Sequence, residues 1–181
     1  GTAIVSGGKM ICNQAAASQA GGGIQIFNPL GLNANAFQID FDLETTYGNG
    51  NADGISYSFG NDVVQIPSVA TTGTNPENGS GTKLKLSFDA YANASNTTGI
   101  YLMYNCNVQN QTPTTSGVLG YVANTSWCGG SNGTPVSKHI SISITAAGKI
   151  TVMLGNTVIF NQVQLPNGYL AANKSTWSHV F

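Results

Sequence analysis

The sequence is poor in charge. Asp, Glu, Lys and Arg together make up 7% of its 181 residues, whereas about 25% is usual for a soluble protein. Arginine is absent and the six lysines are scattered, so the chain lacks the clustered cations that bind nucleic-acid phosphates. A surface with few charges of either sign and a net charge of −1 also tends to associate. The composition therefore excludes a nucleic-acid-binding protein and favours self-association.

Long apolar runs are missing as well. No stretch approaches the ~20 apolar residues of a membrane-spanning helix, so we predict no membrane span. Intrinsic disorder is also excluded, because disordered chains combine low hydrophobicity with high net charge, whereas 41% of these residues are apolar and the net charge is −1. The chain begins at Gly1 rather than at a methionine, and we expect a mature form from which a leader has been removed.

Cysteine is scarce. Cys106 and Cys128 lie on either side of a polar loop, and we predict a disulfide between them, which would stabilise the fold by ~3 kcal/mol. Cys12 is left over, either as a free buried thiol or as an intermolecular link. Paired Cys-x-x-Cys spacings are absent and the two histidines, His139 and His179, stand alone, so we expect no zinc site.

Asparagine, threonine and serine take the place of the missing charges. They supply 54 of the 181 residues and glycine adds 23, a mixture that favours strands and tight turns. Seven Asn-x-Ser/Thr sequons occur, where composition alone gives about four. We predict covalent N-glycans on several of them, and hence a secreted protein that is extracellular or on the cell surface. The sequons begin at Asn78, Asn93, Asn96, Asn110, Asn124, Asn132 and Asn173.

Apolar and polar residues alternate with a period of two along much of the chain. This pattern is typical of strands with one buried face. In residues 37–44, for example, it turns Phe37, Ile39, Phe41 and Leu43 inward. Gly155-Asn156 joins two such runs as a two-residue hairpin turn. The expected strands are 23–27, 37–44, 53–59, 84–88, 100–104, 139–145, 150–154, 157–160 and 175–181. They predict an all-β fold, an antiparallel two-sheet sandwich or jelly roll formed by residues 9–181 as one domain.

The strand at 37–44 also carries acids. Asp40, Asp42 and Glu44 share its other face at intervals of two residues, as the acid and nucleophile of a glycosidase can. The spacing resembles the Glu-x-Asp-x-Glu strand of laminarinase-like glucanases, with Asp40 in place of the first Glu. The alternative is a solvated polar face, and we expect the protein not to be an enzyme.

Three segments together resemble a known family. The string FDAYAN at 88–93 is similar to the FDTYxN loop of L-type (legume-like) lectins. FQIDFDLETTYGNGNADGISYSFG and SKHISISITAAGKITVMLGNTVIFNQVQLP agree with the same family in order and spacing, so the resemblance covers roughly residues 20–181. It implies a concanavalin A-like sandwich of two large antiparallel sheets.

The resemblance also implies binding residues. Asp53 matches the sugar-binding Asp of the family, and Asn93 matches an Asn that binds both calcium and sugar. Asp89 matches the Asp that bridges two metal ions, and Tyr91 matches a residue that supplies a main-chain carbonyl. An exposed Trp127 could stack on a sugar ring, or it could shield the predicted disulfide.

The metal site departs from the family pattern. Ser87 stands where the family has a metal-binding Glu, Thr97 replaces a His, and the later Asp is absent from residues 94–96. A transition-metal site is therefore not expected. Calcium is possible, but a site with one carboxylate would be weak, since calcium needs six or more oxygen ligands.

The C-terminal strand TWSHVF is followed in this family by a loop and a final strand, but here the sequence stops at Phe181. The sequence is incomplete, or residues 1–6 fold back, or they complete a neighbouring copy in trans. In the last case residues 1–8 would be a donor strand, with a Gly7-Gly8 hinge. The donor residues would be Thr2, Ala3, Ile4, Val5 and Ser6.

Two functions remain open. Strand addition in trans is head-to-tail and gives a homopolymeric filament. The first hypothesis is therefore a structural subunit of a glycosylated extracellular filament whose partners are copies of itself. The alternative is a secreted carbohydrate-binding lectin module with a weak or absent calcium site.

Overall fold

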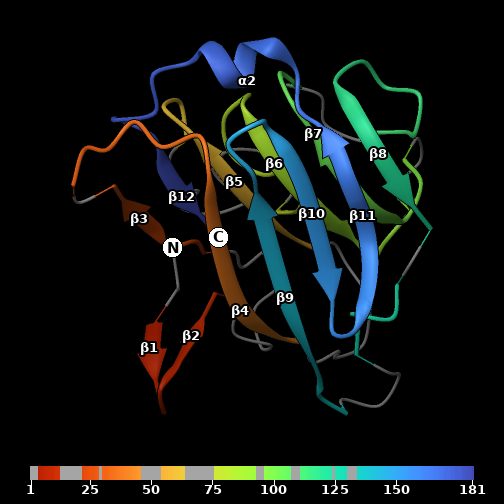
Figure 1. The fold of residues 1–181 in the computed structure, drawn as a ribbon. Coiled ribbons are helices and arrows are strands. Elements are labelled where there is room, and N and C mark those ends of the chain that lie inside the picture. Colours follow the sequence, from red (N-terminus) through yellow and green to blue (C-terminus); the bar gives the residue numbers. More distant parts are fainter. Residues whose placement is uncertain are drawn as a thin grey trace.

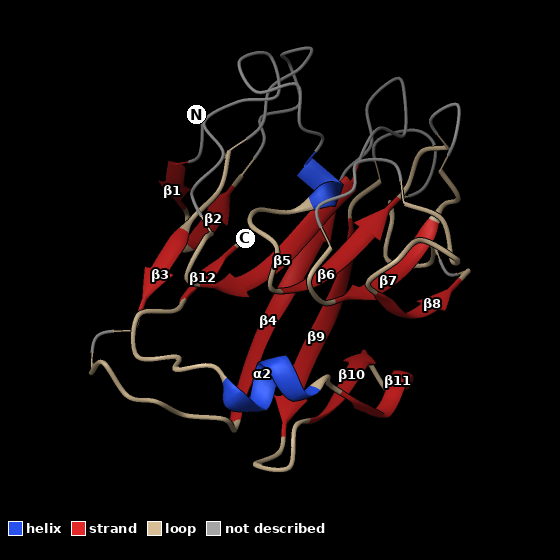
Figure 2. Cartoon of the chain, turned by 90° about the horizontal axis from the view of Figure 1, so that it is seen from above, coloured by secondary structure: helices blue, strands red, loops and turns tan. Residues whose placement is uncertain are grey.

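Two antiparallel sheets face each other in the computed structural model of the chain (Figure 1, Figure 2). The structure describes residues 4–12, 22–28, 30–45, 54–63, 76–92, 96–106, 111–123, 125–129 and 134–181. One sheet has four strands in the order β11-β10-β9-β4, and the other has six in the order β3-β12-β5-β6-β7-β8. A separate pair, β1-β2, belongs to neither sheet. The predicted all-β antiparallel sandwich is confirmed.

Most strands overlap the predicted runs, but the sequence analysis did not predict β2 or β8. The four-stranded sheet contains β4 (Phe37–Thr45), β9 (Val136–Ile144), β10 (Lys149–Leu154) and β11 (Thr157–Gln164). The six-stranded sheet contains β3 (Gln25–Phe27), β5 (Gly54–Gly60), β6 (Leu84–Asp89), β7 (Gly99–Met103), β8 (Val118–Val122) and β12 (Ser178–Val180). The separate pair is β1 (Ile4–Ser6) with β2 (Lys9–Ile11), and the helical turns are η1 (Pro76–Asn78) and α2 (Asn167–Ala171). No helix among the described residues is long and apolar enough to cross a membrane.

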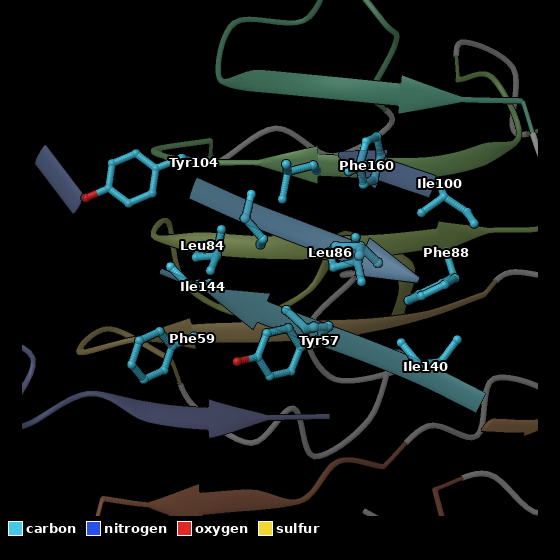
Figure 3. Packing of buried hydrophobic residues seen from close by; sticks show 14 of the residues in the cluster. Tyr57, Phe59, Leu84, Leu86, Phe88, Ile100, Tyr104, Ile140, Ile144 and Phe160 are labelled. Atoms are coloured by element: carbon cyan, nitrogen blue, oxygen red, sulfur yellow. The ribbon is translucent and has the colours of Figure 1, made fainter. Parts of the chain in front are cut away.

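The core lies between the two sheets (Figure 3). Ile140 and Ile142 of β9 are 0% exposed, and they face Leu86 and Phe88 of β6 and Ile100 of β7 across the sandwich. Alternation produces this layer, because every second side chain of each strand points to the same face. The predicted turn at Gly155-Asn156 is also confirmed, since Leu154 pairs directly with Thr157 in the β10–β11 hairpin.

The opposite face of the six-stranded sheet is covered by loops. Lys85, Ser87 and Asp89 of β6 point away from the core, yet each is at most 2% exposed. Gln111 Nε2 donates a hydrogen bond to Ser87 Oγ at 3.0 Å, and the Cδ of Lys85 lies against Gly79. The loops that hold these groups bury the polar side chains that alternation would otherwise expose.

The predicted Cys106–Cys128 disulfide is wrong. None of the three cysteines forms a disulfide in the structure. Cys106 packs with Tyr101 and Met103 on the loop-covered face of the six-stranded sheet, whereas Cys128 packs against the core on the other face. The sheet therefore lies between the two sulfur atoms, and sequence spacing does not reveal on which face a residue falls.

Candidate functional site

Strand β4 is the edge of the four-stranded sheet. It pairs with β9 along its whole length, and no other described strand pairs with it. Its inward-facing residues Phe37, Ile39 and Phe41 are only half-buried. Their direct partners on β9 (Ile144, Ile142 and Ile140) are at most 3% exposed. The difference arises because β9 has a neighbour on both sides and β4 has one.

The edge of the six-stranded sheet that contains β3 and β12 lies against β4 on the same side of the sandwich. The ring of Phe181, just beyond β12, lies 5.0 Å from that of Phe41, and the ring of His179 lies 5.3 Å from that of Phe37. Ile26 of β3 pairs with His179 and so shares its core-facing side, but Ile26 is 45% exposed. The residues Ile26, Phe37, Ile39, Phe41 and Phe181 form what we call the open edge.

A half-buried histidine lies next to the open edge. The Tyr57 hydroxyl and His179 Nδ1 are 2.8 Å apart, and the rings of His179 and Phe59 stack at 4.5 Å. Burial lowers the pKa of His179. The neutral ring is thus favoured, and it adds to the apolar character of the open edge.

The β1–β2 hairpin lies beside the open edge. Gly7 and Gly8, with φ of 57° and 74°, form the two-residue turn between Ser6 and Lys9, a conformation that glycine adopts without strain. Val5 is 76% exposed and Ile4 44% exposed. A Lys9 Nζ–Glu44 Oε2 ion pair of 2.6 Å joins the hairpin to the end of β4. Thr2 and Ala3 of the predicted assembly strand lie outside the described residues, and the division of the chain at residue 8 stays a prediction.

The connection from β3 to β4 is held by hydrogen bonds to Lys174, between α2 and β12. The Lys174 main-chain N–H donates to Asn33 Oδ1 at 2.9 Å, and Lys174 Nζ donates to Asn35 Oδ1 at 2.7 Å. The same ammonium group donates to the carbonyls of Tyr169 and Ala172. We call Lys174 with these partners the lysine clamp. Nothing in the sequence pattern pointed to it, because lysine is normally exposed.

The acids of β4 lie on the solvent face, as predicted. His139 of β9 lies opposite them, with Nδ1 2.8 Å from Asp42 Oδ1 and Nε2 3.6 Å from Asp40 Oδ1. The hydrogen bond with Asp42 raises the pKa of His139, while hydrogen bonds from Ser141 and Gln38 lower the pKa of Asp40. A glycosidase acid needs a raised pKa, so Asp40 is poorly suited to that role.

The loop after β6 carries the residues that the lectin resemblance marks. Asp89 is 0% exposed; its Oδ1 accepts the Tyr91 N–H at 3.1 Å and its Oδ2 accepts Asn96 Nδ2 at 2.6 Å. The same Asn96 nitrogen lies 3.5 Å from the Tyr91 carbonyl oxygen. Asp53 and Asn93 lie outside the described residues. Gly54, which directly follows Asp53 in the chain, pairs with Asp89, and the roles predicted for Asp53 and Asn93 stay predictions.

These groups do not fit a calcium ion. Calcium takes six to eight oxygen ligands, and within the described part of this loop the observed contacts involve one carboxylate, that of Asp89, and one main-chain carbonyl, that of Tyr91. No group of three or more His, Cys, Asp or Glu side chains is close enough to hold a metal within the described ranges. The contact between Asn96 and Asp89 was not expected, because the sequence marked Asn96 only as a sequon.

Trp127 is a core residue. It is 2% exposed and its ring lies 5.5 Å from that of Phe88. A sugar cannot stack on a ring that is buried on both faces, and there is no disulfide for it to shield. The structure thus replaces both interpretations of Trp127 with a packing role.

Three of the seven predicted glycosylation sites are described. Asn173 is exposed, Asn78 is 3% exposed, and Asn96 donates its side-chain amide to Asp89. Glycosylation stays a prediction for all seven, with Asn173 the most accessible of these three. The other four lie outside the described residues: Asn93, Asn110, Asn124 and Asn132.

No family model and no curated protein sequence matches the chain. Solved structures do. The exoplasmic/lumenal domain of VIP36 in its Ca2+/Man-bound form is similar with a TM-score of 0.62 and 13% identity, over 99% of this chain and 72% of that one. Lectin II from Ulex europaeus is similar with a TM-score of 0.60 and 16% identity, over 99% of this chain and 80% of the lectin. The lectin UEA-II complexed with galactose gives 0.57 and 14%, over the same shares. The chain therefore has the concanavalin A-like sandwich fold of the legume-type lectins.

Proposed function

We propose that this protein is the structural subunit of an extracellular, glycosylated filament, in which the N-terminal strand of one copy adds to the open edge of the next. The observation that carries the proposal is the half-buried state of Phe37, Ile39 and Phe41, whose side chains face the core. A further strand beside β4 would bury them and pair the main-chain groups on the unpaired side of β4. Unpaired edges of this kind favour the addition of a strand.

The N-terminal segment suits this role in length and in composition. Five extended residues span about 17 Å, which is roughly half of the nine-residue β4. In Thr2–Ser6, Ala3 and Val5 share one face, and that face can turn toward the core. The segment can leave β2 readily, because three residue pairs hold its described part there and a short two-stranded hairpin is marginally stable in water.

The proposed addition of the N-terminal strand of one copy to the open edge of the next is head-to-tail. The donor segment and the open edge are different surfaces of one chain, so each copy donates once and accepts once. Such contacts do not close on themselves and they extend into a filament. The low charge of the chain is compatible with this, because little electrostatic repulsion opposes the contact between copies.

Electron microscopy and light scattering of the native protein test the proposal. Val5→Asp places a charge on the donor face at a position that is 76% exposed in the single chain, so it should block filaments without lowering the melting temperature. Val158→Asp is the matched control, since Val158 is a 48% exposed apolar residue on β11. The wild type and Val158→Asp should give fibres. Fibres from Val5→Asp, or none from the wild type, would refute strand addition.

A second candidate is a carbohydrate-binding lectin module. The pairing of Gly54 with Asp89 favours it, because Gly54 directly follows Asp53 in the chain and Asp89 begins the loop that carries Asn93. Two of the similar lectin structures are described as bound to Man and to galactose, and we extend carbohydrate binding to this chain as a proposal. Titration with both sugars tests it: Asp53→Ala and Asn93→Ala should abolish binding and Asn161→Ala should not. Absence of binding by the wild type would remove this candidate.

A further inference from the structure

We propose that the side-chain amide of Asn96 takes the place of calcium in the loop after β6, so that this lectin-type loop is closed by a hydrogen-bonded cross-link and needs no metal. The inference is independent of filament assembly. It rests on three groups: the Asp89 carboxylate, the Tyr91 carbonyl and the Asn96 amide nitrogen.

The amide nitrogen bridges two oxygen atoms that a cation would bridge. One of its hydrogens points to Asp89 Oδ2, with a nitrogen–oxygen distance of 2.6 Å. The same nitrogen lies 3.5 Å from the Tyr91 carbonyl oxygen. Calcium–oxygen distances are about 2.3–2.6 Å, so a cation bound to both oxygens would need the space that Asn96 Nδ2 occupies. The amide and the cation therefore exclude each other.

The buried carboxylate explains why some positive group is needed. Asp89 is 0% exposed, and burying a carboxylate is unfavourable unless hydrogen bonds or opposite charges compensate it. The Tyr91 N–H satisfies Oδ1 at 3.1 Å, and the Asn96 amide satisfies Oδ2. Two neutral donors thus hydrogen-bond the two oxygen atoms of the carboxylate, and the amide ties residue 96 back to the end of β6.

The orientation of the amide follows from the charge of its partner. If the oxygen and nitrogen of the Asn96 amide exchanged places, an oxygen would face the Asp89 carboxylate and repel it. Asn96 Oδ1 is buried without a hydrogen-bond partner among the described residues. The side chain therefore accepts one unsatisfied oxygen in order to place its nitrogen between Asp89 and Tyr91.

This role conflicts with glycosylation of the same residue. An N-glycan replaces one hydrogen of Nδ2, which would remove one of the two contacts and place a sugar in the loop. We therefore expect Asn96 to be unmodified in the native protein although it begins a sequon. Asn173, which is exposed, has no such restriction.

Thermal unfolding of the full chain in excess calcium chloride and in EGTA tests the inference. The wild type should melt at the same temperature in both. Asn96→Asp sets two carboxylates against each other, so its melting temperature should fall in EGTA and recover in calcium. Asn161→Asp is the control, because Asn161 is exposed on β11; it should behave as the wild type in both buffers.

Two results would overturn the inference. One is a wild-type melting temperature that rises with calcium, and the other is an Asn96→Asp variant that is unaffected by EGTA or is not rescued by calcium. If Asn96→Asp does not fold, calorimetric titration of the wild type with calcium decides the matter, since the inference requires no binding. Peptide mass spectrometry of the native protein gives a separate readout, in which a glycan on Asn96 would contradict it.

Discussion

Replacing Lys174 by methionine tests the lysine clamp that holds the β3–β4 connection. Lys174 is 1% exposed, and no carboxylate forms an ion pair with it among the described residues. Its ammonium group is held by three oxygen atoms, those of Asn35, Tyr169 and Ala172. It also lies 4.2 Å from the centre of the Tyr169 ring. Methionine keeps the length of the side chain and removes these contacts.

The contacts give the expected magnitude. Three acceptors, one of them in a buried hydrogen bond and two in part-buried ones, lose their donor at a cost of about 1 kcal/mol each, and the lost cation–π contact adds about 1 kcal/mol. Burial lowers the pKa of Lys174, which means that the charged form is desolvated, and removing the charge returns about 2 kcal/mol. The net loss in the free energy of unfolding is about 2 kcal/mol, or about 4–8 °C in melting temperature for a chain of this size.

Calorimetry and urea titration at neutral pH measure the effect. Lys149→Met is the control, because Lys149 is exposed on β10, and it should change the melting temperature little. Asn35→Ala combined with Lys174→Met should cost less than the sum of the two single changes, since both remove the same hydrogen bond. A Lys174→Met variant that is as stable as the wild type would refute the reasoning, because its hydrogen bonds would then only offset desolvation.

Further predictions concern pH and backbone packing. Burial lowers the pKa of His179. The stability that the neutral ring contributes is therefore complete above about pH 6.5 and is lost as the pH falls toward the folded pKa. His179→Phe should flatten the acid side of a profile of melting temperature against pH. The hydrogen bond with Asp42 raises the pKa of His139, so the stability that His139 contributes is complete below about pH 6.5 and is lost as the pH rises through its folded pKa. His139→Asn should therefore lower the melting temperature on the acid side of the same profile and change it little at alkaline pH. A Cβ on Gly54 would lie 2.0 Å from the Phe88 carbonyl oxygen, so Gly54→Ala should lower the free energy of unfolding by more than ~3 kcal/mol. A Cβ on Gly155 meets nothing within 4 Å, so Gly155→Ala should cost about 1 kcal/mol for its positive φ alone. Urea titration measures both.

Residues that alternate strictly along a strand could be placed from the sequence. The inward set of β4 and the predicted solvent face of Asp40 and Asp42 are both confirmed by the burial pattern of that strand. The strand predicted at 100–104 is also confirmed, as β7, and it is buried throughout. Period and hydropathy suffice in these cases, because the environment of each residue is set by the sheet itself.

Residues whose environment is set by a distant segment could not be placed. Lys85 and Ser87 alternate as an exposed face would, but loops from elsewhere in the chain bury them. Trp127 and Cys128 lie in a polar loop that reads as exposed, yet both pack on the core. The helix α2 was not predicted, because its five residues after Pro166 are too few to show a helical period. In each case the missing information is a long-range contact.

The two candidate functions use different parts of the sandwich. The open edge joins β4 of one sheet to β3 and β12 of the other, while the loop of Asp89 follows β6, which is separated from β12 by β5. A donor strand beside β4 would therefore leave the Asp89 loop uncovered on each subunit. A filament with an exposed lectin-type loop on every copy is physically consistent, and the two sets of variants separate its parts. Val5→Asp should remove the fibre and retain any sugar binding, whereas Asp53→Ala should remove the sugar binding and retain the fibre. If Val5→Asp also abolished sugar binding, the binding would depend on assembly through avidity, and the two functions would be one.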